Sequence, residues 1–271
     1  MENGYNEIFT RNIGLFTAAD QDKLRKCSIG VAGLGGVGGL LAERLIRLGV
    51  GQLKISDPGV FEKSNLNRQI YSSLPNLGRN KAEVIYSHIK DINPEASISW
   101  SPEGVRTESE AESFIDGCDI IIDERHIGLF KEAILLQRAA RRKGIYYMFS
   151  VAYGFGALIA IFDPLGMTLE EYDGIPLDVD IEDPEKLNVP FEKIMPVIPS
   201  YASTMDVDLV RKMHLGELPG SVTGIGAGLA SILAANESAN IILQKRRIVT
   251  APEFIYVDLL DQTFTVKNIV S

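Results

Sequence analysis

Short apolar runs alternate with amphipathic stretches along the first 163 residues. Residues 28–33 and 120–123 have the length and composition of strands that are buried on both faces. Further strands are predicted at residues 52–56, 96–101, 145–151 and 157–162. Apolar residues recur at helical spacing, or lie between helix start and stop signals, over residues 18–26, 40–48, 81–92, 109–115 and 129–143. This alternation predicts an α/β fold with a Rossmann-like, doubly wound and mainly parallel sheet.

The pattern changes after residue 163. Residues 164–223 hold seven of the twelve prolines and an acidic cluster of Asp178, Asp180, Glu182, Asp183 and Glu185. Such a segment is too polar and too interrupted for a core, and it predicts a crossing loop, a lid or a partner-binding insertion. A helix over residues 225–243 and strands over 254–259 and 263–266 follow, which predict a C-terminal extension of the sheet with antiparallel strands.

Composition narrows the class of protein. The 271 residues are 45% hydrophobic, which is enough for one substantial core. The net charge of −9 repels phosphate backbones and anionic lipids, so neither nucleic acid nor a membrane is the expected partner. The N-terminus lacks the basic start and apolar run of an export signal, and the two cysteines, Cys27 and Cys118, cannot form a four-cysteine zinc site. We therefore expect a cytoplasmic protein.

A glycine-rich turn lies between the first strand and the helix that follows it. Its glycines are Gly33, Gly35, Gly36 and Gly38. In this position, glycines allow a tight turn that brings backbone N–H groups close to a phosphate at the helix N-terminus. Asp57 ends the next strand, where a carboxylate can accept hydrogen bonds from ribose hydroxyls. The pattern predicts a site for ATP or a dinucleotide.

The residues after Asp57 favour a triphosphate over NAD. The stretch Ser64-Asn65-Leu66-Asn67-Arg68-Gln69 is followed by Gly78-Arg79-Asn80-Lys81, and neither stretch has a role in hydride transfer. Arg68 and Lys81 can neutralise the charge that develops as pyrophosphate leaves, while Asn65, Asn67 and Gln69 supply polar groups around the nucleotide.

Over residues 8–163 the chain resembles the ThiF/MoeB/HesA adenylyltransferases, which share their fold with ubiquitin-activating enzymes. The resemblance rests on Arg11-Asn12-Ile13-Gly14, the glycine-rich turn, Asp57, residues 65–69, Gly78 with Lys81, and Asn93-Pro94. It implies that Mg-ATP adenylates a carboxylate and that pyrophosphate is released. It also implies that Asn65, Arg68, Gln69 and Lys81 surround the phosphates, and that Arg11 reaches the site of the other protomer in a homodimer.

The predicted metal site departs from the family pattern. The family places a second, Mg²⁺-binding aspartate three residues after the aspartate that ends the strand, whereas this chain reads Asp123-Glu124-Arg125-His126. Imidazole is a poor ligand for a hard cation. We therefore assign Mg²⁺ to Asp123 and Glu124, with Asp123 as the preferred ligand and a catalytic residue. The chain has no cysteine after residue 118, so a late cysteine cannot accept the acyl group.

Three functions remain open from the sequence. The first is an adenylating enzyme that acts on a small molecule, a peptide terminus or a modified nucleoside and passes the acyl group to a non-cysteine nucleophile. The second is a catalytically impaired, nucleotide-binding regulatory subunit, which the histidine at position 126 favours. The third is an NAD-dependent oxidoreductase, although His88, His126 and His214 form no dehydrogenase pattern. For the first function we expect a single adenylation domain: arm 1–27, nucleotide-binding core 28–163, crossing loop or lid 164–223, and helix and strands 224–271.

Overall fold

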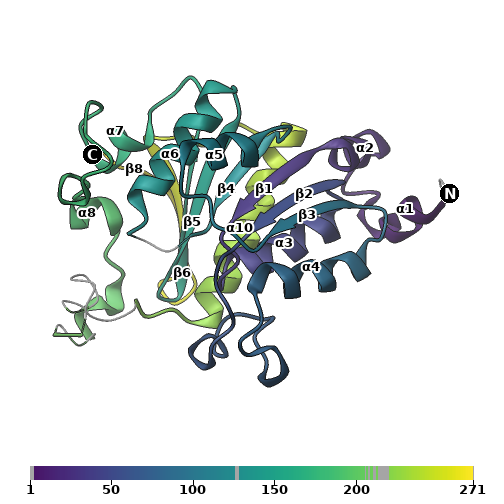
Figure 1. Ribbon diagram of the computed structural model, residues 1–271, viewed down its shortest axis with the longest axis horizontal. Helices are drawn as coiled ribbons and strands as arrows, with labels where there is room; N and C mark the ends of the chain where they lie inside the picture. Colours follow the sequence, from purple (N-terminus) through teal and green to yellow (C-terminus); the bar gives the residue numbers. More distant parts are fainter. Residues whose placement is uncertain are drawn as a thin grey trace.

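A computed structural model describes residues 3–125, 128–204, 206, 208–209, 212 and 220–270. Its centre is one eight-stranded sheet in the order β3-β2-β1-β4-β5-β6-β7-β8 (Figure 1). The strands are β1 (Ser28–Ala32), β2 (Gln52–Ser56), β3 (Ser97–Ser101), β4 (Ile120–Asp123), β5 (Tyr146–Tyr153), β6 (Gly156–Phe162), β7 (Glu253–Asp258) and β8 (Thr263–Asn268). The first five strands are parallel and the last three pair antiparallel, as the sequence predicts.

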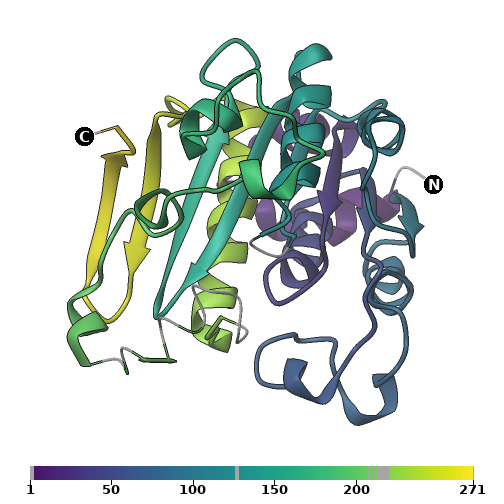
Figure 2. The same ribbon diagram turned by 60° about the vertical axis from the view of Figure 1, so that its left-hand side comes forward.

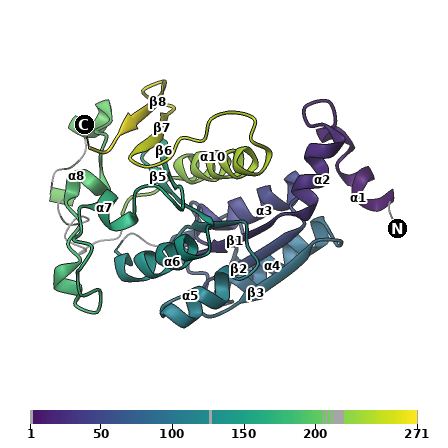
Figure 3. The same ribbon diagram turned by 90° about the horizontal axis from the view of Figure 1, so that it is seen from above.

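Helices cover both faces of the sheet. They are α1 (Asn3–Ile8), α2 (Ala18–Lys26), α3 (Gly38–Leu48), α4 (Lys81–Ile92), α5 (Glu108–Ile115), α6 (Phe130–Arg142), α7 (Leu169–Asp173), α8 (Phe191–Ile194) and α10 (Gly224–Leu243). Buried side chains of α3, α4 and α10 belong to one hydrophobic cluster, and those of α5, α6 and α7 belong to another. In Figure 3, α3 and α10 accordingly lie on one side of the sheet, and α5 and α6 on the other.

Local sequence signals explain where several helices begin and end. Thr17 caps α2 in a capping box with Asp20, and Asn80 caps α4 by accepting a hydrogen bond from the Glu83 amide. Gly49 ends α3 in the left-handed conformation that suits glycine. Most of the predicted boundaries agree with the structure to within two residues because such caps are encoded locally.

The prediction that residues 164–223 lie outside the core is wrong for the first part of this segment. Six of its residues are buried in the cluster under α6: Leu169, Tyr172, Ile175, Leu187, Val189 and Val197. They are spaced among prolines and acids, and only short stretches of them share a period, so composition alone conceals them. The acidic cluster between Asp178 and Glu185 remains at the surface, where Lys131 pairs with Glu182 and Lys186 with Asp183. Glu170 and Asp173 of α7 are buried with the apolar residues.

Helix α10 is long and apolar enough to cross a membrane by length and composition alone. However, 61% of its most apolar stretch is buried inside the protein, where Ala230 and Ala234 are fully covered. Helices α3, α2 and strands β5 and β6 contact it. In this structure α10 is a core helix, in agreement with its polar Asn236, Glu237 and Asn240.

Candidate functional site

The carboxyl ends of β1, β2 and β4 meet at one edge of the sheet. Strand β1 pairs with both β2 and β4, so the strand order reverses at this point, which is where open α/β sheets bind ligands. Gly33 follows β1 with φ +91°, and an added Cβ would lie 2.6 Å from the Glu124 backbone. A Cβ on Gly38 would lie 1.9 Å from the Gly33 carbonyl oxygen. The turn therefore requires glycine at both ends.

Asp57 holds the glycine-rich turn in place. One carboxylate oxygen accepts a hydrogen bond from the Leu34 amide at 2.6 Å, and the other accepts from the Gly59 amide at 2.7 Å. The side chain is buried. An ionised carboxylate has about four acceptor positions, so two remain for other donors such as ribose hydroxyls.

Lys81 lies close to the same carboxylate. A Cβ built on Gly59 would be 2.9 Å from Asp57 Oδ1 and 3.2 Å from Lys81 Nζ, so both groups border one small volume. The Lys81 backbone amide also donates to the Gly59 carbonyl at 3.0 Å. The sequence prediction that Asp57 and Lys81 belong to one site thus has a geometric basis, because Gly59 leaves room for both.

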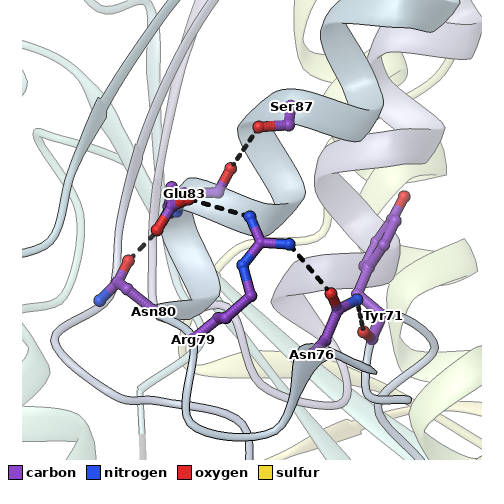
Figure 4. A network of polar contacts seen from close by, with 6 residues as sticks. All are labelled: Tyr71, Asn76, Arg79, Asn80, Glu83 and Ser87. Atoms are coloured by element: carbon purple, nitrogen blue, oxygen red, sulfur yellow. Dashed lines mark hydrogen bonds and ion pairs between the residues drawn. The ribbon is translucent and has the colours of Figure 1, made fainter. Parts of the chain in front are cut away.

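A long connection between β2 and α4 carries the remaining polar residues, and it extends beyond the edge of the sheet (Figure 2). Hydrogen bonds to the start of α4 hold it (Figure 4). Arg79 donates to both Asn76 and Glu83, and Asn76 donates to the Tyr71 carbonyl. Asn80 accepts from the Glu83 amide. This network fixes the position at which Lys81 begins α4.

Residues 64–69 bring Gln69 and Arg68 over the glycine-rich turn. A Cβ on Gly35 would meet the Gln69 amide nitrogen at 3.9 Å, and one on Gly36 would meet the Arg68 stem at 3.3 Å. Within the described residues, the buried Gln69 Oε1 has no hydrogen-bond partner. A buried polar atom without a partner is costly, and it indicates that a donor is supplied by a ligand or by water.

The two asparagines of this stretch make contacts within the protein. Asn65 accepts a hydrogen bond from the Glu62 amide and so stabilises its own turn. Asn67 donates to the Val222 carbonyl at 3.0 Å, just before α10, and accepts from Arg68. The structure thus gives both residues a role in shaping the connection; whether they also contact a nucleotide stays a prediction.

The N-terminus of α10 is a part of the site that the sequence did not reveal. Thr223 caps this helix, and Ala227 in its first turn lies 3.3 Å from the position of a Cβ on Gly36. The N-terminus of α3 starts at Gly38 in the same turn. Since helix N-termini carry unsatisfied N–H groups and positive dipole ends, two of them beside one glycine turn favour a polyanion. This proximity joins distant parts of the chain and leaves no local signal.

Asp123 is engaged by its neighbours. The Arg125 side chain donates to both of its oxygens, at 2.6 and 2.5 Å, and the Tyr147 hydroxyl donates at 2.9 Å. The Asp123 and Arg125 side chains are only 5% and 10% exposed. The negative charge of Asp123 raises the pKa of Arg125 above its ordinary value, although burial opposes this. The pair is therefore a buried, bidentate ion pair, which the sequence prediction of a free metal ligand did not anticipate.

Glu124 lies between the glycine-rich turn and β5. Its Cβ is 3.1 Å from the position of a Cβ on Gly38, and its Oε1 accepts a hydrogen bond from Ser150 at 2.6 Å. Burial and the charge of Asp123 raise the pKa of Glu124 well above its ordinary value, while the bond from Ser150 opposes them. His126 lies outside the described residues, and no cluster of three or more potential ligands to a metal is found among those that are described.

Arg11 belongs to a separate part of the surface. It lies in a short 3-10 helix, Thr10–Asn12, and is exposed. The arm that carries it is held by Asn12 and Gln21, which donate to the Leu48 carbonyl, and by Tyr5, which donates to the Gly49 carbonyl. This arm therefore packs on the C-terminal end of α3, whereas the glycine-rich turn lies at the N-terminal end of that helix.

Comparisons with known proteins place nearly the whole chain in one family. Residues 9–270 match the ThiF family. The chain is 34% identical over 116 residues to a tRNA threonylcarbamoyladenosine dehydratase of Bacillus subtilis, covering 42% of this chain and 45% of that protein. It is 28% identical over 142 residues to a sulfur carrier protein adenylyltransferase of Thermus thermophilus, covering 52% and 51%. The chain spans about half the length of the curated relatives it matches.

Solved structures show the same fold at low identity. A crystal structure of PaaA superposes with a TM-score of 0.72 and 15% identity, covering 99% of this chain and 75% of that chain. A structure of Escherichia coli MccB with AMPCPP and MccA superposes with a TM-score of 0.72 and 18% identity, covering 99% and 72%. The predicted α/β class with its antiparallel C-terminal strands is confirmed by the structure and these superpositions.

Proposed function

Because the chain belongs to the ThiF family, we propose that it binds ATP at the glycine-rich turn and uses it to adenylate a carboxylate. The observation that supports this most directly is the convergence of Asp57, Lys81 and the partnerless Gln69 Oε1 on that turn. A glycine turn, a helix N-terminus and a lysine match a triphosphate better than they match any group that transfers hydride.

In this proposal the role of each residue follows from its position in the site. Asp57 orders the turn and accepts from the ribose, the amides at the start of α3 meet the phosphates, and Lys81 with Arg68 neutralises the charge on the leaving pyrophosphate. An oxygen of the substrate carboxylate forms a bond to the α-phosphorus, and the bond from that phosphorus to the bridging oxygen breaks. The products are an acyl adenylate and pyrophosphate, and a non-cysteine nucleophile then takes the acyl group.

The residues present fit a magnesium ion that arrives with ATP. Mg²⁺ is commonly held by one or two carboxylates together with waters and substrate phosphates. Glu124 touches the glycine-rich turn, whereas Arg125 and Tyr147 already donate to Asp123. We therefore propose Glu124 as the principal ligand, and Asp123 as the residue that positions Arg125. The ion would supply charge neutralisation at the phosphates.

Pyrophosphate release tests the proposed reaction. Purified protein, Mg²⁺ and ATP are incubated with pools of amino acids, peptides and nucleosides that carry carboxylates. We expect pyrophosphate release in the presence of only one of these pools. For Lys81→Ala we expect kcat to decrease by about 100-fold or more, because a cation that stabilises the charge developing in the transition state contributes about this much. Lys23→Ala, an exposed lysine of α2, serves as the control and should retain full activity. Equal rates for the two variants would remove Lys81 from the site.

The second candidate is the catalytically impaired regulatory subunit. The buried pairing of Asp123 with Arg125 favours it, because the paired carboxylate is not available to bind a metal ion. Calorimetry separates the two functions. ATP binding without pyrophosphate release from any carboxylate pool would support the regulatory subunit. Binding of NAD in place of ATP would support the NAD-dependent oxidoreductase, and it would exclude both the adenylating enzyme and the ATP-binding regulatory subunit.

We further propose a homodimer in which Arg11 acts across the interface. Its exposure and its distance along α3 from the glycine-rich turn agree with action on a second subunit. If so, mixing inactive Arg11→Ala protein with inactive Lys81→Ala protein should restore up to about a quarter of the wild-type activity, because mixed dimers hold one intact site out of two. A fluorescence assay of subunit exchange is the control. Exchange without recovery of activity would show that Arg11 does not act in trans.

A further inference from the structure

A cavity of about 110 Å³ lies between β5, α6 and the crossing segment that contains α7 and α8. Helix α7 contacts both α6 and α8, so the crossing segment closes this side of the sheet (Figure 1). Its wall is mainly apolar and aromatic and includes Phe130, Ala133, Phe149, Val151, Leu169 and Tyr172. An engineered apolar cavity of about 150 Å³ binds benzene, and this cavity is smaller, so it has room for a branched aliphatic side chain.

The cavity shares a wall with the proposed adenylation site. Ser150 lines the cavity and donates to Glu124 at 2.6 Å, and the Glu124 backbone touches the turn at Gly33. Two covalently linked groups could therefore occupy the two sites together: a carboxylate at the phosphates and its neighbouring substituent in the cavity. Leu169 and Val189 of the crossing segment are buried in the core beside this cavity, and Ile194 packs against them partly exposed, so the crossing segment forms part of the cavity wall.

The charges around the cavity balance one another. Asp123 and Arg125 form an ion pair at one end, and the Tyr147 hydroxyl donates to Asp123. At the other end, Lys193 donates to the Ile269 carbonyl, and burial raises the pKa of Asp173 to about 7. A charged substituent of either sign would lose its hydration and would meet a charge of its own sign at both ends, since each end holds one acid and one base. Such a placement is unfavourable. An uncharged, apolar substituent has no such penalty.

Resting on the proposed function, we propose that the cavity receives the apolar side chain next to the reacting carboxylate. The substrate class is then a carboxylate with a branched aliphatic substituent, such as the terminus of a peptide that ends in leucine or valine. A chain that ends in glycine would leave the cavity empty, and one that ends in aspartate or lysine would place a charge in it.

Turnover and binding of N-acetylated amino acids test this assignment. We expect kcat/KM for pyrophosphate release with N-acetylleucine to exceed that with N-acetylglycine by about 10- to 100-fold, and N-acetylaspartate to be no better than N-acetylglycine. Ala133→Phe, which fills the cavity from α6, should reduce the leucine rate at least about tenfold and the glycine rate less than about twofold. Ser113→Phe, which adds the same ring at an exposed position of α5, is the control.

A second measurement separates this assignment from the proposed function. Ligand-observed NMR, without ATP, should detect N-acetylleucine bound to the native protein and to Ser113→Phe, but not to Ala133→Phe. Binding of this kind without pyrophosphate release would support the cavity and overturn the adenylation reaction. Equal turnover of the glycine and leucine derivatives, or no binding of N-acetylleucine, would overturn the cavity assignment. Should Ala133→Phe fail to fold, Ala133→Leu provides a smaller obstruction.

Discussion

Replacing Asp123 by asparagine is expected to lower the free energy of unfolding by about 3–5 kcal/mol. Removing one charge of a buried ion pair leaves the other without compensation, and here Arg125 is only 10% exposed on its side chain. Tyr147 also loses its charged acceptor. Urea denaturation followed by circular dichroism measures the change.

Two further variants test whether the broken ion pair causes the loss of stability in Asp123→Asn. Asp22→Asn breaks an exposed pair with Lys26, whose side chains are 53% and 74% exposed, and should cost less than about 1 kcal/mol. Adding Arg125→Met to Asp123→Asn should recover part of the lost stability, because it removes the uncompensated charge. If Asp123→Asn were as stable as Asp22→Asn but inactive, Asp123 would belong to the reaction and not to the ion pair.

The Glu124→Gln variant is expected to keep its fold and to lose about 100-fold or more of the magnesium-dependent pyrophosphate release. Glutamine retains the carbonyl that Ser150 donates to, but it is a weaker ligand than a carboxylate for a hard cation. The measurement is kcat as a function of Mg²⁺ concentration, with the melting temperature as the check on folding.

Ser150→Ala serves as the control for the Glu124 variant. It removes the hydrogen bond to Glu124 but leaves the carboxylate, so a smaller decrease, about 10-fold, is expected from a supporting residue. A Glu124→Gln enzyme with unchanged kcat and unchanged Mg²⁺ dependence would return the metal to Asp123 or to a residue outside the described part of the chain.

Local signals predicted the parts of the site that lie within one βαβ unit. The glycines after β1 and Asp57 after β2 adopt the expected arrangement because adjacent parallel strands end at one edge. The cap at Asn80 likewise explains the position of Lys81. These features depend on residues that are close in sequence, or that are brought together by a single crossover of fixed handedness.

The features that could not be predicted depend on distant residues. In the sequence, Asp123 looks like a carboxylate that is free to bind a metal ion. In the structure, Tyr147 of the neighbouring strand and the Arg125 side chain both donate hydrogen bonds to it. Leu169 and Val189 look like isolated apolar residues in a polar loop until α6 and β5 provide surfaces that bury them. Pairings of this kind are decided by tertiary packing, for which a single sequence contains no period.

The contact between Gly36 and Ala227 bears on how the protein is synthesised. The glycine-rich turn emerges from the ribosome early, but its neighbour in α10 is made only after the crossing segment is complete. Because α10 also covers β5 and β6, a nascent chain that ends before residue 224 leaves one face of these strands bare. The surroundings of the glycine-rich turn and the cover of β5 and β6 are therefore completed by the same late helix, so a nascent chain acquires both together.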